Sequence, residues 1–433
     1  MQQRASNCKN TYTRNLLEWL HVAVQAGSRD GNREKGAQEM RVLHTADWHL
    51  GKTLEGRSRF EEQQKFIDEL VDIVRREKVD LILMAGDVYD TVNPPAAAEQ
   101  LFYEGVARLR AEGCLLAAIA GNHDHPERVA SVRPLVQDTG ISLVGLPMEK
   151  ALKLDIGRTG ERAVIAALPY PSEARLNELL TLDGTDEGLL RRAYSERVGM
   201  LMRKLAADFS PHTVNLAMSH IYVLGGLESD SERPIQVGGA YTVDPSALAC
   251  GAQYTALGHL HRPQIVKGEG IIRYSGSPIS YSFSEAGQAK SVMMMDIEPG
   301  AEPRLQEIYL SCGRQLVEWD AKEGLGQVHR WLDEGRDAGA FIDLRITLTE
   351  AMSMSDIQTL RRACDGLVHI RPVYPQLEQA DQPEERTRLP MHELFKTFYR
   401  RQTGGAEPEE ALVSLFMELA ADEQERMEGG DAE

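Results

Sequence analysis

The sequence predicts an α/β protein, and two patterns carry this prediction. Short apolar runs of the kind that form buried strands recur along the chain. Between several of these runs, apolar residues repeat at i, i+3, i+4 and i+7, as on a helix that packs against a sheet. The 433 residues, of which 42% are hydrophobic, exceed one ordinary domain and can enclose a sizeable core.

Five of the apolar runs end abruptly in polar residues, and helices are predicted around them. The runs are residues 41–46, 81–85, 114–120, 214–219 and 254–257. One predicted helix carries Ile67, Leu70, Val71 and Val74 on one face, and a second spans residues 96–112. Further strands are expected at residues 163–168, 291–297 and 341–346, and further helices at residues 189–207, 326–334 and 355–364. The order of elements therefore alternates, as in α/β folds.

The polar residues at the strand ends are of types that bind metal ions. They are Asp47, His49, Asp87, Asn122, His220, His259 and His261. Alternate side chains of an extended segment share a face, so we expect Asp47 to point the same way as His49. The same holds for His259 and His261. Seven oxygen and nitrogen donors without a thiolate fit Mn²⁺ or Fe²⁺ better than a structural zinc site.

Residues 121–124 place an amide that can bind metal, Asn122, beside an imidazole that can donate a proton, His123. Gly121 is expected to let the backbone turn sharply after the buried strand. The alternative is a surface turn, because Gly, Asn and Asp are ordinary turn residues. Recurrence of the same arrangement at five strand ends favours an active-site loop over a surface turn.

The motif set Asp-x-His, Gly-Asp, Gly-Asn-His-Asp, His and Gly-His-x-His resembles the calcineurin-like metallophosphoesterase superfamily. Within it, four further segments resemble the SbcD family of bacterial nuclease subunits. These segments are residues 220–226, 229–233, 256–264 and 273–278. The resemblance runs from Met40 to about Ala421.

This resemblance implies two sheets packed face to face with helices outside, a smaller α+β capping domain and a C-terminal helix pair. We expect the nuclease domain at residues 40–285, the DNA-positioning cap at 290–380 and the helix pair at 388–422. Residues 1–39 match nothing in the family and are expected to form a flexible extension. Family members process DNA ends and hairpins with SbcC, a coiled-coil ATPase. The resemblance thus implies an ATP-dependent exonuclease and endonuclease of DNA repair, recombination and replication, with a homodimer of this subunit inside a heterotetramer.

The resemblance also assigns roles in the site. One divalent ion, with Mn²⁺ favoured, would be held by Asp47, His49, Asp87 and His261, and the other by Asp87, Asn122, His220 and His259. Two such ions can activate water and stabilise charge on the phosphate oxygens. His123 is expected to stabilise the transition state or protonate the leaving 3′ oxygen, with Asp124 as an orienting partner for its ring.

Two amphipathic helices are predicted near the C-terminus, separated by residues 403–405. A pair this short buries little surface alone, so we expect it to dock on something. The resemblance implies that the helix pair binds the coiled-coil root of SbcC. The alternative is that it docks back on its own domain. The expected contact residues are Leu394, Phe395, Phe398, Leu412, Leu415 and Phe416.

The net charge of −18 opposes tight binding of a polyanion, which normally uses Lys and Arg. Residues 384–433 hold 13 acidic and 6 basic side chains, so −7 of this charge lies far from the motifs in sequence. We infer that strong DNA binding needs a partner. No apolar run reaches bilayer length, so no membrane protein is expected. Five cysteines without CxxC spacing suit a reducing cytosol, so a cytoplasmic location is expected.

Three other classes of function can be compared with this interpretation. A protein phosphatase of the same superfamily would show Gly-Asn-His-Glu, whereas this chain has Gly-Asn-His-Asp. A stand-alone metallophosphodiesterase acting on a smaller substrate would not need the cap or the helix pair. A scaffold that has lost catalysis would not need the complete set of ligands.

Overall fold

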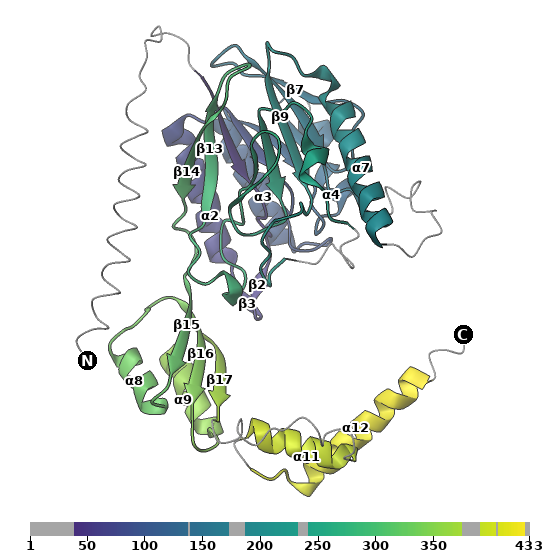
Figure 1. The fold of residues 1–433 in the computed structure, drawn as a ribbon. Coiled ribbons are helices and arrows are strands. Elements are labelled where there is room, and N and C mark those ends of the chain that lie inside the picture. The colour runs from purple at the N-terminus through teal and green to yellow at the C-terminus, as the bar shows by residue number, and fades with distance from the viewer. Residues whose placement is uncertain are drawn as a thin grey trace, which may run out of the picture. The chain divides into compact units, whose positions relative to one another are not determined.

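The computed structural model describes residues 39–136, 139–172, 187–232, 241–374, 390–403 and 406–428 (Figure 1). The expected N-terminal extension lies outside these residues, apart from Glu39. In the described ranges, no helix combines the length and apolar character needed to cross a membrane. The predicted α/β class is confirmed, because two large sheets are each flanked by helices.

The first sheet has six strands in the order β14-β13-β1-β4-β5-β6. The strands β1, β4, β5 and β6 run parallel, and β13 pairs antiparallel with both β1 and β14. Their bounds are β1 (Met40–Thr45), β4 (Leu81–Met84), β5 (Leu115–Ile119), β6 (Ile141–Val144), β13 (Ser291–Ile297) and β14 (Arg304–Tyr309). The helices α2 (Phe60–Glu77) and α3 (Ala96–Ala111) pack on one face of this sheet. The hairpin β2 (Thr53–Leu54) and β3 (Arg57–Ser58) precedes α2, and α4 (Pro126–Ala130) and α5 (Arg133–Val136) precede β6.

The second sheet has six strands in the order β11-β12-β10-β9-β8-β7. The strands are β7 (Leu152–Asp155), β8 (Arg162–Leu168), β9 (Val214–His220), β10 (Tyr254–Gly258), β11 (Gln264–Val266) and β12 (Ile272–Tyr274). The central strands β8, β9, β10 and β12 are parallel to one another. The helix α7 (Glu187–Leu205) packs on the outer face, and three short 3-10 helices, η1 (Ala206–Asp208), η2 (Pro245–Leu248) and η3 (Phe283–Glu285), lie in connections.

The two sheets pack face to face around a shared core. Alternate residues of β1 illustrate the arrangement, because Val42 faces the second sheet and Leu43 faces the helices α2 and α3. Inner-face residues of β8 and β9, such as Ile165 and Leu216, meet Val42 in one fully buried cluster. The predicted sandwich with helices outside is therefore confirmed.

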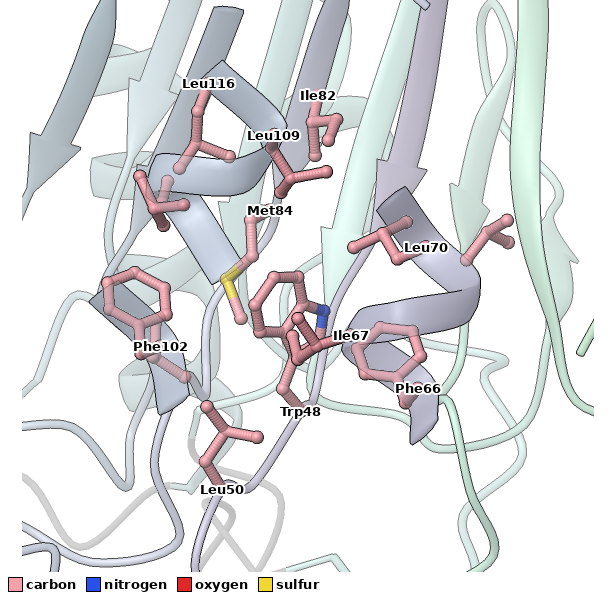
Figure 2. Close-up of a cluster of buried hydrophobic side chains, with 14 of the residues drawn as sticks. Trp48, Leu50, Phe66, Ile67, Leu70, Ile82, Met84, Phe102, Leu109 and Leu116 are labelled. Carbon is pink, nitrogen blue, oxygen red and sulfur yellow. The ribbon is translucent and has the colours of Figure 1, made fainter. Parts of the chain in front are cut away.

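Trp48 anchors the loop that follows β1. Its side chain is fully buried under α2 and α3, with its ring edge-to-face against Phe66 at 5.2 Å and Phe102 at 6.0 Å between centroids (Figure 2). The indole N–H donates to the hydroxyl of Thr45 at 2.9 Å, so its polar atom is satisfied. This anchor lies between the predicted ligands Asp47 and His49 and fixes the backbone of both.

The strands β13 and β14 correct one sequence-based expectation. A cap that began at residue 290 would contain residues 291–297, but β13 pairs with β1 from Met40 to His44 and so belongs to the first sheet. Met294 faces the helices, while Met293 and Met295 lie between the sheets, so the methionine run fills the core as expected. We propose that the cap begins near Cys312, after β14.

The smaller domain contains a three-stranded parallel sheet in the order β15-β16-β17 with two helices. The elements are β15 (Leu316–Ala321), α8 (Leu325–Asp333), β16 (Phe341–Thr347), α9 (Met354–Ala363) and β17 (Leu367–Val373). Its own core contains Trp319, Val328, Leu344 and Leu360. The predicted helices and strand of this region are confirmed to within two residues at each end.

The C-terminal helices are α11 (Met391–Gln402) and α12 (Glu410–Glu428). Phe395 stacks on Phe416 with centroids 4.2 Å apart and an interplanar angle of 12°. Phe398, Leu412 and Leu415 are 58%, 37% and 51% exposed. The six apolar residues predicted to bind a partner are therefore not all exposed. Phe395 and Phe416 pack on each other and hold the two helices together.

Candidate metal centre

The seven predicted ligands lie at one edge of the sandwich. Asp47 and His49 follow β1, Asp87 follows β4, and Asn122 follows β5, which are parallel neighbours in the first sheet. In the second sheet, His220 ends β9, and His259 and His261 follow the parallel neighbour β10. Carboxyl ends of parallel strands meet at the same edge of a sheet, which brings together residues far apart in sequence.

The backbone that presents four of these ligands is left-handed and not extended. Asp47, His49, Asp87 and His259 have φ values of 55°, 43°, 52° and 107°, a region that residues other than glycine rarely adopt. The expectation that an extended segment aligns Asp47 with His49 is therefore wrong, because β1 ends at Thr45. Hydrogen bonds between the loops hold these turns, since Asp47 N–H donates to Gly86 O and His49 N–H donates to Asp87 O, both at 3.0 Å.

Residue 121 must be a glycine because no side chain fits at this position. Its φ is not among the positive values, so the sharp turn expected of it is not the reason for a glycine. A Cβ atom at this position would lie 2.1 Å from Oδ1 of Asp87. Gly86 combines both demands, with φ at 97° and a Cβ position 2.2 Å from Nδ1 of His220. The loops approach so closely that side chains are excluded there.

Donor atoms converge on Asp87 from both sheets. Its Oδ2 lies 3.4 Å from Nε2 of His220 and 3.5 Å from Nε2 of His49. Nε2 of His220 is also 2.8 Å from Oδ1 of Asn122, and Nε2 of His49 is 3.0 Å from Nε2 of His261. Asp87 therefore stands between two groups of potential ligands, one on each side.

The tautomer of His220 shows why this cluster suits a cation. Nδ1 lies 2.9 Å from the carbonyl oxygen of Ala85, to which it can only donate. In the neutral ring, Nε2 then carries a lone pair that faces two oxygen acceptors, Asn122 Oδ1 and Asp87 Oδ2. Asp47 Oδ2 is also buried without a hydrogen-bond partner. A divalent ion can take the place of the proton that Nε2 would otherwise need between these oxygens, so these residues fit such an ion.

The electrostatics of the cluster are strongly perturbed, as in many functional sites. Burial raises the pKa of the Asp47 carboxyl to about 7. Burial opposes the charge on His220, but the carboxylates of Asp87 and Asp47 raise its pKa to about 9. Burial and the neighbouring His220 lower the pKa of His259 well below its usual range. The metal-free cluster therefore holds protons that a bound cation would displace.

His259 belongs to the same edge through its backbone. Its N–H donates to Oδ1 of Asp47 at 2.9 Å, and its ring lies edge-to-face on His220 with centroids 5.5 Å apart. Among the His, Cys, Asp and Glu side chains of the described residues, three groups are close enough to share one ion: Asp47, His49 and His261; Asp47, Asp87 and His220; and His49, Asp90 and His123. His259 is buried beside these groups and is not a member of them.

His123 lies at the rim of the cluster, with its ring edge-to-face on His49 at 4.7 Å between centroids. Its Nδ1 lies 2.6 Å from the backbone carbonyl oxygen of Asp90, and its backbone N–H donates to Asp87 Oδ1 at 2.9 Å. The side chain is 9% exposed. The ring therefore has one engaged nitrogen, and Nε2 is the nitrogen left for chemistry.

Asp124 does not orient the His123 ring, contrary to the expectation from sequence. Its carboxylate accepts backbone N–H groups of Gly121, Tyr89 and Val88 at 2.8, 2.9 and 3.1 Å. Asp124 thus ties the loop after β5 to the loop after β4. The ring of His123 is held by the Asp90 carbonyl instead.

Three residues around the ligands have no role predicted from the sequence. Asp90 Oδ1 lies 3.4 Å from Nδ1 of His49 and 2.8 Å from Nζ of Lys52. Burial opposes ionisation of Asp90, but His49 and Lys52 hold its pKa well below the usual range. Ser231 and Glu285 lie behind His261. Ser231 lies in the segment 229–233 that resembles the SbcD family, and this is its sequence signal.

Comparison with known proteins agrees with the fold and the donor set. A family model described as calcineurin-like phosphoesterase matches residues 40–263. A second model, described as the type 5 capsule protein repressor C-terminal domain, matches residues 312–403. The sandwich and the converging donors are thus those of a calcineurin-like phosphoesterase.

Similarity to curated relatives identifies the family within this class. The SbcD subunit of the nuclease SbcCD from Bacillus subtilis is 50% identical over 388 residues, which cover 89% of this chain and 99% of the relative. The SbcD subunit of Rhodobacter capsulatus is 37% identical, covering 61% and 68%, and that of Escherichia coli K12 is 29% identical, covering 77% and 83%. This chain belongs to the SbcD family of nuclease subunits.

Proposed function

We propose that this chain hydrolyses DNA phosphodiester bonds with two bound divalent ions, as the nuclease subunit of an SbcCD-type complex. The observation that carries the proposal is the placement of Asp87 between Nε2 of His49 and Nε2 of His220, at 3.5 and 3.4 Å. A carboxylate so placed suits a bridging ligand. The names of the relatives supply the substrate class, since they are nucleases.

The proposed ions are held from both sheets. One set of ligands is Asp47, His49, Asp87 and His261, and the other is Asp87, Asn122, His220 and His259. Mixed imidazole, carboxylate and amide donors favour Mn²⁺ over metals that prefer thiolates. When bound, such ions provide Lewis acidity that activates water and offsets charge on the phosphoryl oxygens.

The protein's own residues position the reaction. Nδ1 of His123 donates to the Asp90 carbonyl, so in the doubly protonated ring Nε2 is the atom that would give a proton to the leaving 3′ oxygen or hydrogen-bond the phosphoryl group. The backbone N–H of His123 donates to Asp87, so the acid and the bridging carboxylate are held in one unit. Asp124 supports this unit from behind through its three backbone hydrogen bonds.

Duplex DNA needs help to reach this site. A chain with net charge −18 repels a polyanion, so we propose that a coiled-coil ATPase of the SbcC type delivers DNA ends. The proposed contact is the exposed apolar surface of α11 and α12 around Phe398, Leu412 and Leu415, supported by the stacked pair Phe395 and Phe416 and by Leu394. Two copies of this chain would join the ATPase in a heterotetramer in the cytoplasm.

The test is cleavage of linear and hairpin DNA by the purified chain with Mn²⁺, with and without the ATPase partner and ATP. The expected result is slow cutting by the chain alone and ATP-stimulated cutting of duplex ends with the partner. A parallel assay with bis-p-nitrophenyl phosphate measures the chemistry of the site without DNA. Hydrolysis of the small ester with no cleavage of any DNA would contradict the nuclease proposal and favour a phosphodiesterase of smaller substrates.

A further inference from the structure

We propose that Ser231 and Glu285 form a hydrogen-bonded relay that fixes the tautomer of His261 and so makes it a metal ligand. Neither residue touches the reacting atoms, so both are positioning residues. The inference rests on the proposed two-metal function, because it assigns a task to residues behind one of the ligands. It is carried by the contacts on the side of His261 that faces away from His49.

The Ser231 hydroxyl contacts both the imidazole of His261 and the carboxylate of Glu285. Ser231 Oγ lies 2.6 Å from Nδ1 of His261 and 2.6 Å from Oε1 of Glu285. Nδ1 and Oε1 themselves are 3.6 Å apart, beyond hydrogen-bond distance. The serine hydroxyl is therefore the bridge between the imidazole and the carboxylate. Its distance to Glu285 is that of a charge-assisted O–H···O⁻ bond.

Glu285 can only accept in this arrangement, which sets the direction of the relay. It is fully buried, and its Oε1 accepts the backbone N–H groups of Tyr281 and Ser282 at 3.0 and 3.2 Å. Oε2 forms an ion pair with Nζ of Lys290. A carboxylate surrounded by donors keeps its charge, so the single proton of the Ser231 hydroxyl points to Glu285. The lone pairs of Ser231 Oγ are left to face His261.

The tautomer of His261 follows from this direction. Nδ1 must carry the proton, because the Ser231 oxygen opposite it already directs its own proton to Glu285. Nε2 is then unprotonated and points at Nε2 of His49, 3.0 Å away, on the side proposed to hold an ion. Carboxylates commonly orient metal-binding histidines by accepting their second N–H. Here a hydroxyl is interposed between the carboxylate and the ring.

A neighbouring contact competes for the same hydroxyl but does not change the direction. Ser229 Oγ lies 2.9 Å from Ser231 Oγ, and it also donates to Oε2 of Glu232 at 2.6 Å. Because Ser229 directs its proton to Glu232, it can only accept from Ser231. The ionised oxygen of Glu285 is closer and carries more charge, so it is the stronger acceptor.

The same segment also holds the backbone of His261. Glu232 Oε1 accepts the N–H of His261 at 2.8 Å, and Lys290 Nζ donates to its carbonyl oxygen at 2.9 Å. Residues 229–232 and Lys290 thus fix the main chain, while Ser231 and Glu285 fix the ring. The relay completes a support that holds the N–H, the carbonyl oxygen and Nδ1 of His261 and leaves Nε2 facing His49.

The test compares Mn²⁺ binding by calorimetry, and thermal unfolding of the metal-free protein, for the wild type, Ser231→Ala and Ser231→Thr. The matched control is Ser246→Ala, which removes a hydroxyl that also donates to a carboxylate at 2.6 Å but lies in η2. Without the hydroxyl, His261 can place its proton on Nε2 and cease to be a ligand. Ser231→Ala should bind one of two ions about 10- to 100-fold more weakly. Ser231→Thr keeps the hydroxyl and should bind both ions like the wild type, as should Ser246→Ala. Each variant should show a cooperative unfolding transition without metal.

Equal affinity of Ser231→Ala and wild type for two ions would overturn the relay and leave the two-metal function intact. Equally weak binding by Ser231→Thr and Ser231→Ala would also overturn it, because a restored hydroxyl would then not restore the ligand. Failure of the wild type to bind Mn²⁺ would instead remove the proposed function, and the relay with it.

Discussion

The Nε2 atoms of His49 and His261 lie 3.0 Å apart although 212 residues separate them in the chain. Nδ1 of His261 is bound to the Ser231 hydroxyl, whereas Nδ1 of His49 is buried without a hydrogen-bond partner, 3.4 Å from Oδ1 of Asp90. Nε2 of His261 therefore presents a lone pair to the ring of His49 inside a buried site. A cation can take a lone pair from each of the two rings, so we expect Mn²⁺ to raise the Tm of the metal-free protein.

Replacing the bridging carboxylate should remove most of the activity. Asp87→Asn is expected to lose at least one ion and nearly all hydrolysis of bis-p-nitrophenyl phosphate, because Asp87 lies between both groups of ligands. Elemental analysis of the purified variant measures the ion content. Asp68→Asn, an exposed aspartate on α2, is the control and should retain both ions. Two tightly bound ions in Asp87→Asn would show that this carboxylate does not bridge.

His123 should behave differently from the ligands. His123→Ala is expected to keep both ions and to lose about 10²- to 10⁴-fold in rate, the usual contribution of a positioned proton donor. The neighbouring and exposed His125 supplies the control, since His125→Ala should leave both properties unchanged. Loss of an ion in His123→Ala would mean that His123 is a ligand.

Asp124 should matter for stability, because its carboxylate accepts three buried backbone N–H groups. Asp124→Ala leaves these donors without a partner, at about 1–3 kcal/mol each, so a loss of about 3 kcal/mol or more in the free energy of unfolding is expected. Urea unfolding of the metal-free protein measures it. If Asp124 acted only by orienting His123, the variant would lose rate with its unfolding free energy unchanged.

The exposed apolar surface of the helix pair should bind the ATPase partner. Phe398→Ser combined with Leu415→Ser is expected to abolish co-purification with an SbcC-type ATPase and ATP-stimulated cutting of duplex ends. Hydrolysis of the small ester should be unchanged, because the metal centre is untouched. Met354→Ser, at a site 68% exposed on α9, controls for loss of surface apolar area. Normal complex formation by the double variant would place the docking surface elsewhere.

Local patterns predict most elements, while the details of the site depend on contacts between distant residues. The stripe of Ile67 and Leu70 predicts α2 because helical periodicity is a local property. The pairing of β13 with β1 joins residues about 250 positions apart, so no window of sequence contains it. Adjacency in sequence suggests Asp124 as a partner of His123, whereas its hydrogen bonds include N–H groups 35 and 36 residues away. The sequence reveals the metal ligands because Asp, Asn and His are all residue types that bind metal ions. It does not reveal the left-handed turns that orient them.

Those left-handed turns lower the folding stability of the protein, and selection can act on this loss. Asp47, His49 and Asp87 each occupy a conformation that disfavours an L-residue by roughly 1–2 kcal/mol. Glycine would relieve that strain at every one of them, so selection for stability alone would replace these residues. A descendant released from the need to cut phosphodiesters should therefore drift toward glycine or asparagine first at these three positions, and melt at a higher temperature than its active ancestor.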